Sequence, residues 1–140
     1  KQNWEKLKLK EGNKSVLSGV TKGTPSLIKA FRIQEKVKGI GFEFANAEDA
    51  WKKVEEELEE FHAETNLEKK EMELGDVFFS LVNYARISGI NPDSALERTN
   101  NKFITRFQKM ENLALDKNLK LENLSLEQMD LLWEEAKKGE

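Results

Sequence analysis

The stretch that decides the fold is residues 46–88, which read NAEDAWKKVEEELEEFHAETNLEKKEMELGDVFFSLVNYARIS. Apolar residues recur in this stretch at spacings of three and four, which is the period of an amphipathic helix. Asn46 is a typical capping residue, because its side-chain oxygen can accept a hydrogen bond from a backbone amide of the first turn. Acidic residues follow it in that turn, where negative charge is favoured. The pattern therefore predicts helices over 46–64 and 67–88 that turn back on each other near Thr65 and Asn66.

Both predicted helices carry a broad apolar surface. The second one, over 67–88, is apolar on most of its circumference, which predicts a central and largely buried helix in which Asp76 needs a compensating partner. The first one has a single buried stripe at helical spacing, made of Ala47, Ala50, Trp51, Val54, Leu58 and Phe61.

The rest of the chain also predicts helices, over 2–11, 25–38, 92–115 and 126–138, with glycine-bearing loops over 12–23 and 39–44. Thr24-Pro25 and Asn91-Pro92 each place a capping side chain before a proline at the first helical position. No segment alternates with period two for long enough to be a strand. We therefore expect an all-α helical bundle in a single domain over 1–140, with a capping box at Ser125 and Gln128 that starts the last helix.

Composition excludes several classes of protein. The chain has 140 residues and no cysteine, which excludes disulfides and thiolate metal sites and favours a cytoplasmic location. The net charge is −3, with the 23 basic and 26 acidic residues interspersed, so we expect no nucleic-acid binding. No apolar stretch approaches the roughly 20 residues that span a bilayer, so we expect no membrane partner. Since the chain begins at Lys1, we expect that it was trimmed from a longer parent.

Acidic residues on the two central helices form the main candidate site. Glu57 and Glu60 lie along the border of the buried stripe of helix 46–64, and Glu73 and Asp76 have the same spacing on helix 67–88. An antiparallel hairpin would place Glu57 level with Asp76, and Glu60 level with Glu73. Converging carboxylates repel one another unless a divalent cation lies between them, and oxygen ligands favour Mg²⁺ or Mn²⁺.

Two other interpretations of these acids stay open. An acidic run such as residues 55–60 is often only a solvated helix face. Glu59 and His62 also form one Glu-x-x-His pair, of the kind that di-iron helical bundles use twice, but His62 is the only histidine and a second pair cannot form.

A second cluster combines cations with aromatic residues. Lys102 and Arg106 are one turn apart on one predicted helix face, and Phe103 and Phe107 are expected to anchor the adjacent face in the core. Such a pair can clamp phosphate oxygens, although ordinary surface cations have the same spacing. Trp133 is by default a packing residue, and it could also stack on a base.

Taken together, these motifs resemble the MazG family of nucleotide pyrophosphohydrolases, and specifically the second of the two similar domains in bacterial MazG proteins. The resemblance covers nearly the whole chain. It is carried by Trp4-Glu5 with Lys8 and Glu11, Pro25-Ser26-Leu27 with Ala30, Arg32, Gln34 and Lys36, Gly41-Phe42, Lys53-Val54, Glu56-Glu57-x-x-Glu60, Glu73-Leu74-Gly75-Asp76, Asn83 with Ala85-Arg86, Asn100-x-Lys102-Phe103-x-x-Arg106-Phe107, and Trp133.

The resemblance implies an all-α homodimer that hydrolyses nucleoside triphosphates between the α and β phosphates, for house-cleaning or regulation of the nucleotide pool. It implies Mg²⁺ ligands, with Mn²⁺ as a substitute, at Glu57, Glu60, Glu73 and Asp76. Glu56 or one of these ligands would accept the proton of the attacking water. The positions that correspond to nucleotide contacts are Lys53, Lys102, Arg106 and Trp133, with Lys69 a weaker candidate. The alternative is a non-catalytic helical module that serves for dimerisation or regulation.

Overall fold

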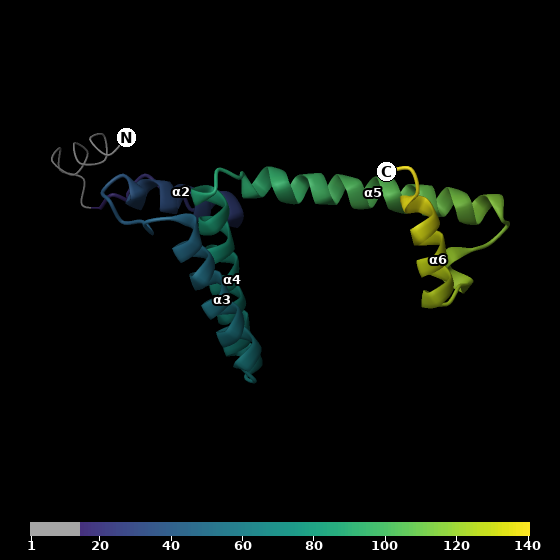
Figure 1. The fold of residues 1–140 in the computed structure, drawn as a ribbon, viewed down its shortest axis with the longest axis horizontal. Helices are drawn as coiled ribbons and strands as arrows, with labels where there is room; N and C mark the ends of the chain where they lie inside the picture. The colour runs from purple at the N-terminus through teal and green to yellow at the C-terminus, as the bar shows by residue number, and fades with distance from the viewer. Residues whose placement is uncertain (1–14) are drawn as a thin grey trace. The chain divides into compact units, whose positions relative to one another are not determined.

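The computed structural model describes residues 15–140, and the predicted helix over 2–11 lies outside the described residues. The regular secondary structure of the described part is entirely helical, with no strand (Figure 1). The prediction of an all-α fold is therefore confirmed. Its elements are α2 (Ser26–Lys38), α3 (Ala47–Ala63), α4 (Leu67–Ile87), α5 (Pro92–Asp116), the 3₁₀ helix η1 (Leu121–Asn123) and α6 (Leu126–Lys137).

The chain divides into two compact units, the first ending at Asp93 and the second beginning at Ser94. The first contains α2, α3 and α4, and the second contains most of α5 with η1 and α6. The single domain expected over 1–140 stays a prediction.

Most helix starts follow the predicted caps. The Asn46 side chain accepts a hydrogen bond from the Asp49 amide at 2.9 Å, and Asn91 accepts one from the amide of Asp93 at 3.0 Å. Ser125 with Gln128 forms the predicted capping box at the start of α6. These side chains satisfy backbone donors that the first helical turn leaves free.

The predicted cap at Thr24 is wrong by one residue. The N-cap of α2 is Pro25, with ψ of 143°, and it makes no side-chain capping bond. The helix therefore begins at Ser26, one residue after the proline, because the extended backbone at Pro25 is not yet helical.

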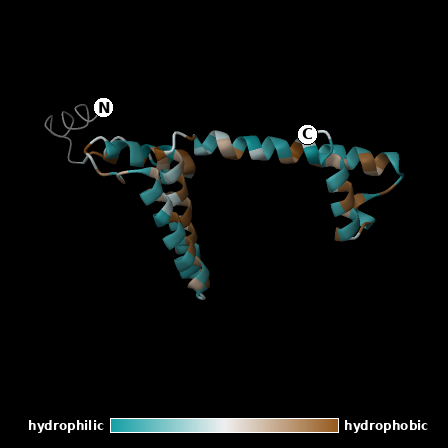
Figure 2. Ribbon diagram, in the orientation of Figure 1, coloured by the Kyte–Doolittle hydropathy of each residue, from teal (hydrophilic) through white to brown (hydrophobic). Residues whose placement is uncertain are grey.

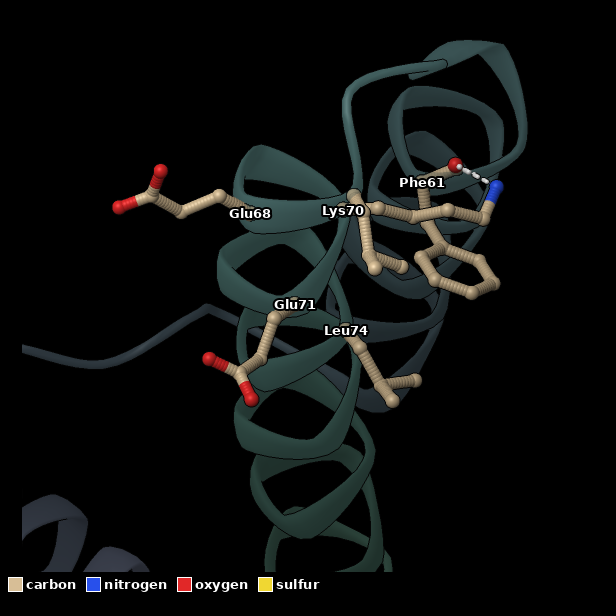
Figure 3. Close-up of a pocket in the computed structure, with 6 residues that line it drawn as sticks. Phe61, Glu68, Lys70, Glu71 and Leu74 are labelled. Atoms are coloured by element: carbon tan, nitrogen blue, oxygen red, sulfur yellow. Dashed lines mark hydrogen bonds between the residues drawn. The ribbon is translucent and has the colours of Figure 1, made fainter.

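Helices α3 and α4 form the predicted antiparallel hairpin, with a turn around Thr65 and Asn66. Asn66 caps α4 by accepting from the Lys69 amide at 3.1 Å. Lys70 then ties the two helices together, because its Nζ donates to the backbone oxygens of Phe61 at 3.0 Å and Glu64 at 3.3 Å (Figure 3). The same ammonium lies 4.4 Å from the centre of the Phe61 ring. A cation at the carbonyl end of a helix is favourable, and here it helps to fix the register of the hairpin.

Helix α2 and the loop that follows it are fixed to α4 by polar contacts. Gln34 is buried and donates from Nε2 to the backbone oxygen of Phe79 at 3.0 Å. The buried Arg86 guanidinium forms an ion pair with Glu43 in the loop and donates to Asn83 at 2.9 Å. Contacts between residues far apart in the sequence therefore hold α2 and its following loop against α4.

The core of the first unit is small. Ala50 and Val54 of α3 and Val77 and Val82 of α4 are buried. Figure 2 shows that hydrophobic residues are nevertheless spread along the length of α4. The buried core therefore uses only part of the apolar surface that α3 and α4 carry.

The predicted burial is wrong at several of these apolar positions. Trp51 and Leu58 of the expected α3 stripe are 42% and 43% exposed, and Phe78 of α4 is 60% exposed. The physical reason is that α3 and α2 are the main partners of α4 among the described helices, so much of its circumference is left uncovered. Helix α4 is thus central to the unit without being largely buried.

The second unit has its own core between α5 and α6, made of Met110, Ala114, Leu132 and Ala136. Phe107 packs against this core as predicted, whereas Phe103 was expected to be anchored there and is 55% exposed. Among the described helices, none combines the length and the apolar character that crossing a membrane requires.

Candidate metal centre

Three of the predicted acids converge between α3 and α4. Glu57 and Glu60 from α3 and Glu73 from α4 each offer a carboxylate oxygen, and these oxygens lie within 4.8 Å of one another. The i and i+3 spacing on α3 puts the first two acids on one face, and the hairpin brings Glu73 to them. We call these three side chains the carboxylate cluster.

Two oxygens of the carboxylate cluster have no protein partner. Oε2 of Glu57 and Oε2 of Glu73 are buried and accept no hydrogen bond, and Glu57 as a whole is only 7% exposed. A buried carboxylate oxygen without a partner is costly, and a bound cation removes that cost. The donor set therefore fits a hard divalent cation, for which carboxylate oxygens are the preferred ligands.

Electrostatic repulsion is visible at the third member of the cluster. The pKa of Glu60 is raised above its usual value, first by the negative charge of Glu57 and further by desolvation and by the charge of Glu73. A raised pKa means that the ionised form is disfavoured where these acids meet. Nearby positive charge therefore does not fully balance the negative charge of the carboxylate cluster.

Lys53 supplies part of that positive charge. Its Nζ lies 3.1 Å from Oε1 of Glu57 and 3.3 Å from Oε1 of Glu56, and these contacts raise the pKa of Lys53. Glu56 lies at the exposed rim of the site, with 56% of its side chain accessible. Lys53 therefore binds one oxygen of Glu57 and leaves the other, buried one unpaired.

Asp76 lies one turn beyond Glu73 on α4, but it does not belong to the carboxylate cluster. The sequence pattern predicted a buried position for it, and that prediction is wrong, because Asp76 is exposed. Its exposure has the same cause as that of Phe78, which is the uncovered circumference of α4. Its role as a metal ligand stays a prediction, as does the nucleotide contact expected of the exposed Lys69 at the start of α4.

Of the predicted nucleotide contacts, Lys102, Arg106 and Trp133 belong to the second unit, whereas Lys53 and Lys69 belong to the first. Arg106 lies over the ring of Trp133, with 5.0 Å between the guanidinium carbon and the ring centre, and Phe103 packs against the same ring at 5.1 Å. Lys102 is exposed. Arg106 also forms an ion pair with Glu140, and no pattern in the sequence predicts this contact.

The di-iron alternative finds no support in residues 15–140. Glu59 and His62 are both exposed, and neither belongs to a cluster of three possible metal ligands in this part of the chain.

Comparisons with known proteins find matches to MazG proteins. The sequence profile of the MazG nucleotide pyrophosphohydrolase domain matches residues 46–110, which include α3, α4 and the carboxylate cluster. The chain is 38% identical over 142 residues to the nucleoside triphosphate pyrophosphohydrolase/pyrophosphatase MazG of Thermotoga maritima. It is 31% identical over 146 residues to the nucleoside triphosphate pyrophosphohydrolase of Escherichia coli, and 42% identical over 148 residues to the uncharacterized protein YabN of Bacillus subtilis.

These alignments cover 98–99% of this chain but only part of each relative. The chain spans 56% of the length of the Thermotoga and Escherichia proteins and 30% of the Bacillus protein. The helical hairpin that bears the facing acids lies within the residues that match the MazG domain. Residues 46–110 of the chain form a MazG-family domain. The resemblance inferred from the sequence is thereby confirmed.

Proposed function

We propose that this chain is a divalent-cation-dependent nucleoside triphosphate pyrophosphohydrolase that cleaves between the α and β phosphates, releasing a nucleoside monophosphate and pyrophosphate. The observation that carries this proposal is the carboxylate cluster with its two unpaired, buried oxygens. The Thermotoga and Escherichia relatives are named for the same class of reaction. Mg²⁺ is the expected cation and Mn²⁺ a substitute, because both prefer oxygen ligands.

Within this proposal the chain supplies binding and orientation. Glu57, Glu60 and Glu73 would hold the cation from two helices, and Asp76 would complete the ligand set. When bound, the cation would neutralise phosphate charge and activate a water molecule. Glu56, at the exposed rim next to Lys53, is in a position to accept a proton from a water molecule in solvent contact.

The nucleotide contacts form a second part of the proposal. Lys53 and Lys69, together with Lys102 and Arg106, would bind phosphate oxygens, and Trp133 would stack on the base. Arg106 suits this role because its guanidinium presents a planar pair of donors that match two oxygens of one phosphate. An aromatic face accepts any base, so we expect broad base tolerance.

We also propose that the protein is a homodimer. The support is the amount of large apolar surface that the single chain leaves accessible on its two central helices, including Phe78 at 60% and Met72 at 69% exposure. Exposed apolar patches on this scale often mark protein–protein contacts. Light scattering at micromolar concentration should give twice the chain mass, and a monomer would contradict this part of the proposal.

The activity is tested with a panel of nucleoside triphosphates and Mg²⁺, by measuring monophosphate and pyrophosphate separately. Both products in equal amounts support the proposal, whereas inorganic phosphate alone indicates a different hydrolase. No turnover on any substrate would favour the non-catalytic helical module. Glu59→Gln serves as the matched control for Glu60→Gln, because it makes the same charge change at the neighbouring position outside the carboxylate cluster.

A further inference from the structure

The end of α6 folds back toward α5 in the second unit (Figure 1). Helix α6 ends at Lys137, and Gly139 follows with φ of +88°, a conformation that side-chain-bearing residues rarely adopt. The amide of Glu140 donates to the backbone oxygen of Lys137 at 3.2 Å, which holds the reversed chain against the helix end. This turn brings the Glu140 side chain to Arg106 of α5.

The contact between the two side chains has bidentate geometry. Nε of Arg106 lies 3.0 Å from Oε2 and 3.2 Å from Oε1 of Glu140, and the Arg106 terminal nitrogen Nη2 binds Oε1 as well. The Arg106 side chain is only 14% exposed and rests on the Trp133 ring. Both donors of the guanidinium edge are therefore oriented and already occupied.

We propose that Glu140 is an internal competitor for Arg106: its carboxylate occupies the donors that a phosphate group would take, so phosphate binding at Arg106 requires the release of Glu140. This inference rests on the placement of Arg106 at the nucleotide under the proposed function. A carboxylate and a phosphate present the same paired oxygens to an arginine fork. Occupation of this edge by one therefore excludes the other from it.

The electrostatics of the second unit agree with a real competition. The ion pair lowers the pKa of Glu140 and raises that of Arg106, chiefly through the hydrogen bonds between them. Glu140 keeps 28% of its side chain accessible, so solvent screens the pair and weakens it. An ion pair of this kind is strong enough to be formed and weak enough to be displaced. It should lower the affinity for a phosphate ligand by about two- to fivefold.

Binding of inorganic tripolyphosphate in the presence of Mg²⁺, measured by calorimetry, is the quantitative test. Glu140→Gln should bind about two- to fivefold more tightly than the unchanged protein, and this gain should vanish in the Arg106→Lys background, which lacks the fork. Gly139→Ala keeps the charge but strains the turn, since alanine disfavours φ near +88°, and should give a smaller gain.

Glu134→Gln is the control for a general charge effect. Glu134 acts on Arg106 only through space, and its own partner is Lys137 at 3.8 Å. Its replacement should change the affinity less than Glu140→Gln does. Equal gains from the two variants would overturn the proposal, because they would show a diffuse field in place of a specific contact.

Displacement is read directly by NMR from the Glu140 carboxyl carbon and the Arg106 Nε–H signal. Added tripolyphosphate should move both signals together and return the pKa of Glu140 to its usual range. A shifted Arg106 signal with Glu140 unchanged would overturn the competition. If the Arg106 signal does not move while nucleotide turnover is normal, this inference is overturned and the proposed function stands. Displacement of Glu140 in a protein that hydrolyses no nucleotide would refute the proposed function alone.

Discussion

The charged clusters of the two units differ in how they are neutralised. Between α3 and α4, Glu57 and Glu73 keep buried oxygens without a partner, and Lys53 covers only part of the negative charge. On α5, one edge of the Arg106 guanidinium is occupied by an internal carboxylate, and the group rests on an aromatic ring. Under our proposals, the first cluster takes a cation from outside the chain, whereas Arg106 releases its internal carboxylate before it binds phosphate.

The largest effect should come from removing one member of the carboxylate cluster. Glu57→Gln or Glu60→Gln should lower kcat/KM for nucleoside triphosphates by about a hundredfold or more, because several kcal/mol of cation-dependent stabilisation of the transition state is lost. Steady-state assays with Mg²⁺ and circular dichroism would check activity and helix content together. Glu59→Gln should keep its activity, and equal loss in Glu59→Gln and Glu60→Gln would refute the assignment.

Cation binding should also stabilise the fold of the first unit. At a hundredfold excess over the dissociation constant, Mg²⁺ should add about 2.7 kcal/mol to the free energy of unfolding. Glu60→Gln should lose this increment. In the absence of metal, Glu60→Gln should unfold at a similar or higher temperature than the unchanged protein, because the substitution removes repulsion between carboxylates and keeps the Lys53–Glu57 pair. Calorimetric melts with and without Mg²⁺ measure both quantities. A Glu60→Gln protein that Mg²⁺ stabilises normally would show that the cation binds elsewhere.

A smaller effect is expected at Arg106. Arg106→Ala should raise KM for nucleoside triphosphates about tenfold, because one charge-assisted contact to phosphate is lost, with a lesser change in kcat. This variant should leave Mg²⁺ stabilisation intact, because Arg106 does not belong to the carboxylate cluster. Kinetics and melts on the same preparation test this, and loss of Mg²⁺ stabilisation in Arg106→Ala would break the distinction between the two clusters.

The smallest effect is a pH dependence at Glu60. Its pKa is raised chiefly by Glu57, so the folded metal-free protein binds this proton more tightly than the unfolded chain does. Stability therefore grows as pH falls from the raised pKa toward the ordinary one, and is lost as pH rises through that window. NMR titration of the Glu60 carboxyl should show a lower pKa in Glu57→Gln. An unchanged pKa would remove Glu57 as the cause.

Sequence alone was sufficient for the described α-helices and for all three members of the carboxylate cluster, but it also added Asp76, which lies outside the cluster. The predicted helix over 67–88 ends one residue beyond the observed α4, Leu67–Ile87, and the facing of Glu60 and Glu73 followed from the hairpin alone. Local capping and helical periodicity determine these features, and both can be read from neighbouring residues.

Burial and the Arg106 contact could not be predicted in the same way. Periodicity assigns Trp51 and Phe78 to apolar helix faces, but the tertiary arrangement decides which element covers each face. Glu140 meets Arg106 across 34 positions of sequence, and a glycine one residue earlier was the only local sign of a turn. Contacts made by single polar residues over such separations leave no periodic pattern.

The central claim is that Glu57, Glu60 and Glu73 share one divalent cation. Titration of the metal-free protein with Mn²⁺, followed by paramagnetic broadening of NMR signals, tests it most directly. We predict that the carboxyl signals of these three residues broaden first and together in the unchanged protein and in Glu59→Gln, and that Glu60→Gln needs much more Mn²⁺. Broadening that begins at other acids, or that is equally strong in Glu60→Gln, would contradict the claim.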